Sequence, residues 1–270
     1  MYLKENYAKA FFQRSATTDL PWKVSHRRLH EEPILTCLFK VYETSMYLSI
    51  LFSSPKDATS AISHLTPGMY KAHAHPPETC PTAVTVSLLY YLVTTYPSQS
   101  RYSESLGSIP HSLLPADTRG WLRELTRALR QHNYAKLEQL TERSTAARAL
   151  IVDSLRAMPS SEPKPGAPPD LAMETLCSLL DSLRSRVRDT TWAVLRSAYR
   201  ELSCPKPTDA TLSLTRDWLL RSLLLRNVTP EVDRHDEALL DSWIQQRISL
   251  GELRAKEGVE GRWIVCKVRA

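Results

Sequence analysis

The sequence predicts a mainly helical protein that ends in a small β-hairpin. Apolar residues recur every three or four positions over most of the chain, which is typical of amphipathic helices. Glycine is scarce and proline is frequent, at 7 and 18 of 270 residues. So few glycines argue against phosphate-binding α/β folds and large β-sandwiches, which need many positions with left-handed backbone. The apolar fraction of 42% and the charged fraction of 24% are close to globular averages, so bulk disorder is not expected.

Helical periodicity begins near residue 34. We expect helices at about 34–52, 57–65, 82–96, 118–131, 134–140 and 144–157. The segments 71–81 and 97–117 are predicted loops, and β-branched residues in 82–96 leave a strand open there. Five prolines in 158–170 predict a surface loop within one helical array rather than a linker between domains.

The last hundred residues change character. The apolar pattern predicts one long helix or two abutting helices over 171–202, ended by Cys204-Pro205. We then expect a short strand at 211–214, a helix capped by Thr215, a helix at about 234–247, and strands at 250–255 and 262–268. A helix, a short strand, two helices and a terminal hairpin follow one another in the order of a winged helix.

Three stretches, in their order and spacing, resemble the GANP-type PCI family, the scaffold proteins of nuclear mRNA export. The first runs from Val41-Tyr42-Glu43-Thr44 to Leu88-Leu89-Tyr90-Tyr91. The second, 125–134, is similar to the family's ALRxGNY corner, where one helix turns into the next. The third runs from Arg184 to Leu202 and on into Leu212-Ser213-Leu214. The resemblance covers roughly 35–268.

The resemblance implies the PCI fold: a right-handed, TPR-like array of helical hairpins at 1–203, followed by a winged helix at 204–270 with a small β-hairpin wing. It implies a non-enzymatic scaffold that pairs with a second PCI-domain protein. A small acidic lid-type subunit is left open as a further partner. It also implies a basic surface for RNA or other single-stranded nucleic acid in mRNA export or transcription-coupled processing. The expected compartment is the nucleus, with the cytoplasm left open.

Positive charge is concentrated toward the C-terminus. The chain has a formal net charge of +6, and residues 184–226 contain nine Lys and Arg against four Asp and Glu. Cations on a winged helix can bind phosphates without reading sequence, and such binding weakens with salt. The candidate nucleic-acid-binding residues are Arg216, Arg221, Arg226, Arg254, Lys256, Arg262 and Lys267. We expect the nearby Trp218 and Trp263 in the core rather than on a base-stacking surface.

The apolar residues near the C-terminus suggest a protein contact. The candidate partner interface is Trp243, Ile264, Val265 and Val268, with the last strand on a sheet edge that a partner strand can extend. Two alternatives to an RNA-binding scaffold stay open. One is a purely protein–protein assembly subunit, as in lid or signalosome complexes, without nucleic-acid contact. The other is a DNA-binding regulator that reads bases with helix 234–247, which the acidic first turn of that helix disfavours.

No motif indicates catalysis, and we expect no enzymatic activity, no cofactor and no metal. His73, His75 and Cys80 lie close in sequence but among prolines and without a fourth ligand, which favours a solvated loop. Five widely spaced cysteines predict reduced thiols. No secretory signal and no apolar run near the ~20 residues of a membrane span are apparent, so we expect no membrane contact.

Overall fold

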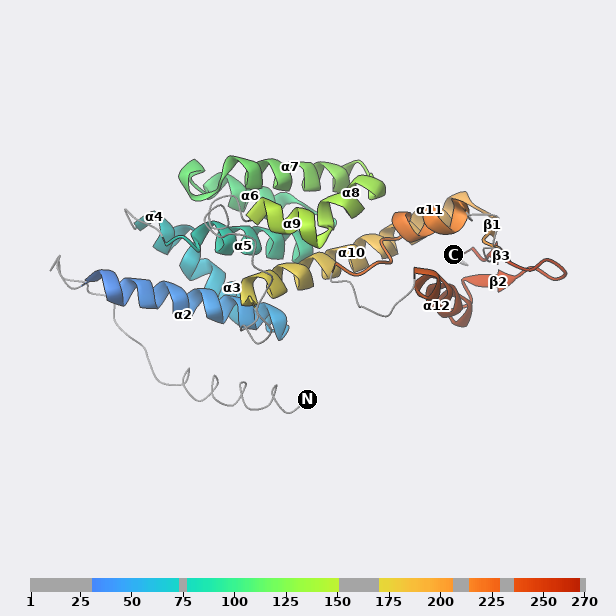
Figure 1. Cartoon of the computed structure of the whole chain (residues 1–270), viewed down its shortest axis with the longest axis horizontal. Helices are drawn as coiled ribbons and strands as arrows, with labels where there is room; N and C mark the ends of the chain where they lie inside the picture. The colour runs from blue at the N-terminus through green and yellow to red at the C-terminus, as the bar shows by residue number, and fades with distance from the viewer. Residues whose placement is uncertain (1–30, 73–76, 151–169, 206–213, 229–235, 268–270) are drawn as a thin grey trace. The chain divides into compact units, whose positions relative to one another are not determined.

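The computed structural model describes residues 31–72, 77–150, 170–205, 214–228 and 236–267 (Figure 1). The chain divides into two compact units, Met1–Leu38 and Phe39–Ala270. Within the described residues helices predominate, and the single sheet is small and antiparallel. The predicted fold class is confirmed at this level. None of the helices in these ranges is long and apolar enough to cross a bilayer.

The N-terminal helices follow the predicted apolar periods. They are α2 (Glu31–Leu51), α3 (Pro55–Ser63), α4 (Tyr70–Ala72), α5 (Cys80–Thr95), α6 (Ser100–Ser108), α7 (Ala116–Arg130), α8 (Tyr134–Thr141) and α9 (Arg143–Leu150), with a 3-10 turn at His111–Leu113. The segment His64–Met69 contains a kink, since Thr66 there has extended backbone. The strand alternative for 82–96 is wrong, because α5 is a helix buried on nearly all sides. It packs against α6, α9 and α10.

The predicted loop at 97–117 is also wrong, because it contains α6 and the 3-10 turn. α6 is rich in serine, and Tyr102 is its one fully buried side chain. A helix with a single buried residue has no apolar period to detect.

The predicted helix at 144–157 is confirmed as far as Leu150, and the rest of it, with most of the proline-rich segment 158–170, lies outside the described residues.

The predicted corner between α7 and α8 is confirmed. The Asn133 side chain accepts a hydrogen bond from the backbone N–H of Lys136 at 3.1 Å and thereby caps α8. His132, just before it, turns the chain with a left-handed φ of +51°. The indole of Trp121 on α7 donates to the backbone carbonyl of Leu140 at 2.9 Å, which ties the two helices together.

The C-terminal part combines helices with the sheet. Its elements are α10 (Leu171–Ala198), β1 (Glu201–Ser203), α11 (Leu214–Ser222), α12 (Asp236–Ser249), β2 (Leu253–Ala255) and β3 (Arg262–Val265). Both strand pairs are antiparallel, and the sheet order is β1-β3-β2. The two predicted hairpin strands are confirmed with shorter bounds.

Two local predictions in this part are wrong. Residues 201–203 form β1, whereas the sequence predicts the end of the long helix there, which instead ends at Ala198. Leu214 and Thr215 lie within α11, so Thr215 is not its N-cap and Leu214 is not in a strand. Residues 211–213 of that predicted strand lie outside the described residues.

α10 belongs to both hydrophobic clusters of the larger unit. Its residues from Leu176 to Val187 lie in the first cluster, with α5 and α7. Trp192 and Leu195 lie in the second, with α11, α12 and the sheet. The rings of Trp192 and Trp243 meet nearly perpendicularly, with centroids 4.8 Å apart. The division at 203/204 stays a prediction, since one helix supplies side chains to both clusters.

A carboxyl group is buried in the first cluster. Glu43 is 4% exposed and accepts a hydrogen bond from the Tyr70 hydroxyl at 2.7 Å. Burial raises the pKa of Glu43, and hydrogen bonds from Tyr70 and Thr79 oppose that rise only in part. In the folded protein, Glu43 therefore holds its proton to a higher pH than in the unfolded chain.

Glu43→Gln is expected to be more stable than the wild type, by a margin that grows as pH rises. Between the unfolded and folded pKa values the folded state binds more protons, so the wild type loses stability with rising pH, and the neutral amide does not. We expect the unfolding midpoint of the variant to exceed that of the wild type by about 2–4 °C at pH 8 and to match it near pH 4. Thermal unfolding from pH 4 to 8 measures this, with the exposed Glu78→Gln as control. A difference independent of pH would contradict it.

Candidate nucleic-acid interface

The solvent face of the sheet gathers three of the predicted cations. The register pairs Glu201 with Ile264 and Ile264 with Arg254, so these side chains lie in one row on one face. Arg262 lies two residues before Ile264 in β3, and Lys256 directly follows β2, where its N–H donates to the Arg262 carbonyl at 3.0 Å, so both share this face. The opposite face carries Leu202, Trp263, Leu253 and Val265, which pack in or against the second cluster, and the exposed Ala255. We call Arg254, Lys256, Arg262 and Glu201 the sheet-face cluster.

Glu201 is the carboxylate of this cluster. Its oxygens accept from Lys256 Nζ at 2.9 Å and 3.1 Å and lie 3.5 Å from Arg262 Nη1. The hydrogen bond from Lys256 holds the pKa of Glu201 below its usual value, and Arg262 adds to this. Arg254 is exposed and forms no ion pair within the described part of the chain. Lys267 is exposed beyond the end of β3.

A groove runs beside the sheet-face cluster, between α12 and the β2–β3 hairpin. Its volume is about 630 Å³. Gln245 and Asp241 of α12 line one side, and Lys256, Arg262 and Trp263 of the hairpin line the other. The carboxylates of Asp241 and Glu260 line the groove together with these cations, so its border carries both signs of charge.

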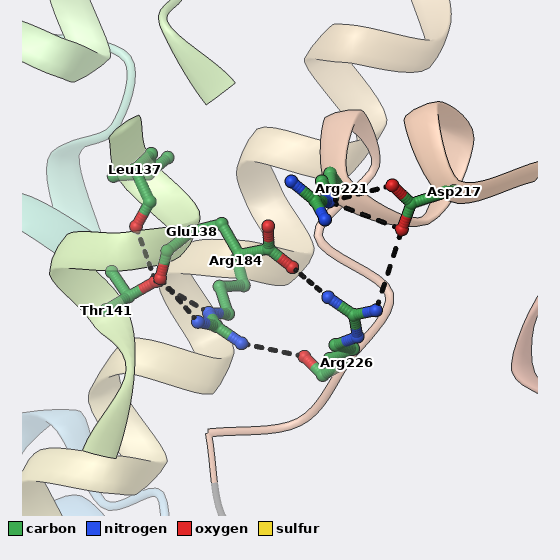
Figure 2. Close-up of polar contacts among 7 residues, drawn as sticks. All are labelled: Leu137, Glu138, Thr141, Arg184, Asp217, Arg221 and Arg226. Atoms are coloured by element: carbon green, nitrogen blue, oxygen red, sulfur yellow. Dashed lines mark hydrogen bonds and ion pairs between the residues drawn. The ribbon is translucent and has the colours of Figure 1, made fainter. Parts of the chain in front are cut away.

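The three cations predicted on and after α11 lie elsewhere. Arg216 is buried, and its guanidinium donates to Asp241 at 2.7 Å. Arg221 pairs with Asp217 at 3.1 Å. Arg226 contacts Glu138 at 3.0 Å and Asp217 at 3.8 Å, as Figure 2 shows. These contacts make Arg216 part of the core and make Arg226 part of a network that joins α8 to α11.

The predicted partner interface is not gathered on the surface. Trp243 and Val265 are 5% and 6% exposed and belong to the second cluster. Ile264 is half-buried on the solvent face of the sheet, and Val268 lies outside the described residues. The expectation that the last strand forms a sheet edge is wrong, because β3 lies between β1 and β2. A partner strand would have to add to β1 or β2.

The structure shows an exposed apolar patch that sequence reasoning missed. Tyr199 and Trp218 are 44% and 40% exposed, and their rings meet edge-on with centroids 6.0 Å apart. Leu214, one turn before Trp218 on α11, is 82% exposed. The expectation of a buried Trp218 is therefore wrong, whereas Trp263 packs against the second cluster as predicted. The spacing of Leu214 and Trp218, four residues on one helix, was the available signal.

Metal-ligating side chains do not converge anywhere in the described ranges. Cys80 is buried in α5, and His73 and His75 lie outside the described residues. All five cysteines are free thiols. In comparisons with known proteins, no family model matches the chain, and no curated protein gives a significant match.

Proposed function

We propose that this chain is a non-enzymatic, PCI-type scaffold that pairs with a second PCI-domain protein and presents a basic surface to RNA in nuclear mRNA export or transcription-coupled processing. Two features support the fold part of this proposal. α7 and α8 meet at the capped Asn133 corner, where the sequence resembles the family motif. α10, β1, α11, α12, β2 and β3 follow one another in the order of a winged helix, with the central position in the sheet taken by the last strand.

The sheet-face cluster carries the RNA part of the proposal. Arg254, Lys256 and Arg262 project from one face with a single carboxylate between them. Their spacing on the β2–β3 hairpin suits contacts to successive phosphates of a single RNA strand. Such contacts provide affinity without reading base identity and weaken as salt displaces the protein cations.

The test is a titration of fluorescent single-stranded RNA at two salt concentrations. The wild type is compared with Arg254→Gln/Lys256→Gln and with the charge-matched control Lys136→Gln/Arg148→Gln, whose exposed cations lie on α8 and α9. The sheet variant is expected to bind more weakly at low salt, with a log–log salt slope smaller by about 0.7 for each lost phosphate contact. Equal behaviour of the two double variants, or no binding by the wild type at low salt, would refute RNA binding by this face.

Glu201→Gln is expected to increase RNA affinity. The substitution removes the carboxylate that holds Lys256 and Arg262, and both cations then become available to phosphates. The salt dependence should steepen by about 0.7 for each released cation that engages a phosphate. The same anisotropy titration measures this, with Glu257→Gln in the hairpin loop as a control of equal charge. An equal gain from the loop control would show that only net charge matters.

A purely protein–protein assembly role is the second candidate. The patch of Tyr199, Leu214 and Trp218 favours it. The exposed rings of Tyr199 and Trp218 are in contact, and the exposed Leu214 lies one helical turn before Trp218. Exposed aromatic and aliphatic side chains grouped in this way are typical of protein interfaces. The RNA titration separates the two functions, since a wild type without affinity at low salt leaves assembly alone.

A further inference from the structure

A second cationic cluster lies far in sequence from the sheet, on one face of α7. Arg119, Arg123, Thr126 and Arg130 are spaced by four, three and four residues, so they form one stripe along the helix. The stripe borders a cavity of about 210 Å³ whose other wall is α6 and the residue before it, with Gln99, Tyr102 and Ser103. We call this the α6–α7 cavity.

Two polar groups at this cavity have no hydrogen-bond partner. The Nη2 atom of Arg119 is buried and unpaired. The hydroxyl of Tyr102, a side chain only 3% exposed, is buried and unpaired as well. Buried donors almost always have a partner, because an unpaired one has lost the hydrogen bonds that it makes with water in the unfolded chain. Both donors belong to residues that line the cavity, and Thr126 Oγ1 is the one nearby acceptor that acts on Tyr102, so Arg119 Nη2 has no acceptor from the described part of the chain.

The residues that line the cavity carry an excess of positive charge, which also favours an anionic ligand. No carboxylate lines it, and none within the described residues forms an ion pair with Arg119, Arg123 or Arg130. Arg127, on a different face of α7, does pair with Glu124 at 3.4 Å. Burial raises the pKa of Tyr102 to about 12, and the charge of Arg119, the nearby Thr126 hydroxyl and the charges of Arg130 and Arg123 oppose that rise. The Thr126 hydroxyl itself donates to the backbone carbonyls of Leu122 and Arg123. Tyr102 is therefore a neutral donor among three cations.

We infer that the α6–α7 cavity binds the phosphoryl group of a phosphate monoester. A dianion with tetrahedrally arranged oxygens offers acceptors to the three guanidinium groups and to the Tyr102 hydroxyl, and Arg suits such oxygens because its donors form a fork. The volume is below the roughly 300–1,000 Å³ of drug-sized ligand sites, so it suits a phosphoryl head rather than a whole nucleotide. This site is separate from the sheet-face cluster and does not depend on the proposed function.

The test measures thermal unfolding while inorganic phosphate replaces chloride at constant ionic strength. The wild type should gain a saturating increase in midpoint, since a ligand that binds only the folded state stabilises it. Arg123→Gln/Arg130→Gln should lose this increase, whereas Arg127→Gln on the same helix should keep it. Without phosphate, the double variant should unfold no earlier than the wild type, because it relieves repulsion between like charges.

Tyr102→Phe provides a second readout that keeps the helix surface unchanged. It removes one donor and should weaken phosphate binding without a loss of stability in chloride. Equal phosphate shifts in all variants, or a shift that does not saturate, would overturn the site. Arg254→Gln/Lys256→Gln should keep the full phosphate shift, so failure of RNA binding at the sheet leaves this test intact.

Two further arms identify the source of the phosphoryl group. A phosphoserine peptide that binds at least tenfold more tightly than inorganic phosphate, and loses binding when dephosphorylated, assigns the site to a phosphorylated protein segment. Equal affinity for peptide and phosphate assigns it to the free anion. Displacement of phosphate from the wild type by single-stranded RNA, absent in Arg123→Gln/Arg130→Gln, would assign the cavity to a phosphodiester and overturn the monoester inference.

Discussion

Arg184→Met is expected to lower the free energy of unfolding by about 3–4 kcal/mol. Arg184 is 2% exposed on α10, and its guanidinium donates at 2.7 Å to Thr141 Oγ1, at 2.8 Å to the Arg226 carbonyl and at 3.1 Å to the Glu138 carbonyl (Figure 2). Methionine fills most of the space but removes the guanidinium donor from all three acceptors, and the contacts to Thr141 and Glu138 are fully buried. One side chain thus holds the end of α8 and the segment after α11 on α10.

The matched control is Arg186→Met. Arg186 lies two residues away on the same helix and is exposed, so its loss should change stability by less than about 0.5 kcal/mol. Urea unfolding of the three proteins measures the difference. Burial lowers the pKa of Arg184, yet an arginine stays charged at any working pH, so the effect should not vary between pH 6 and 8. Equal effects of the two substitutions would mean that the buried network does not contribute.

Gly261→Ala is expected to destabilise the sheet by about 3 kcal/mol. Gly261 has a φ of +73°, and an added Cβ would lie 2.6 Å from Pro205 Cα and 3.2 Å from the Cys204 carbonyl oxygen. Both contacts are with backbone, which cannot move aside as a flexible side chain can. The Cys204 N–H also donates to the Gly261 carbonyl at 2.7 Å. A backbone shift at Gly261 would therefore break this hydrogen bond between the residue after β1 and the β2–β3 hairpin.

Gly258 provides the control for backbone strain alone. Its φ is +74°, but a Cβ there would meet nothing within 4 Å. Gly258→Ala should therefore cost only about 1–2 kcal/mol, the penalty for an L-residue with left-handed backbone. Chemical denaturation of both variants isolates the effect of the Pro205 contact as their difference. Indistinguishable variants would show that the chain yields at Pro205 without cost.

Helices that bury a full apolar stripe were predictable, whereas elements with one buried residue were not. α5, α7 and α10 each repeat buried residues at helical spacing, and their predicted ranges agree with the structure to within a few residues. α6 buries Tyr102 alone, and β1 buries Leu202 alone. One apolar residue fits a helix, a strand or a loop equally well, so tertiary contacts decide such segments.

Two-residue spacing along a strand explains why cations of the candidate site share a face, but the sequence could not distinguish structural cations from solvated ones. Arg254 lies in β2 and Lys256 directly follows it, where its N–H still pairs with the Arg262 carbonyl, so the two side chains share a face. Arg188, by contrast, donates to the carbonyls of Leu223 and Leu224, and Arg196 donates to the carbonyl of Cys266. Several of the arginines in 184–226 thus donate hydrogen bonds to backbone carbonyls instead of facing solvent. Each of these carbonyls lies 35 or more residues away in the sequence, so local composition does not reveal the contact.

The continuity of α10 limits how this protein can be cut for study. Its 28 residues span about 42 Å at 1.5 Å per residue. A C-terminal fragment that starts at 204 lacks Trp192 and Leu195, so it would expose the apolar surface that these side chains cover. A fragment that starts at Asp170, the capping residue, would in turn expose the α10 side chains from Leu176 to Val187. Crystallisation and binding assays therefore need both clusters in one polypeptide.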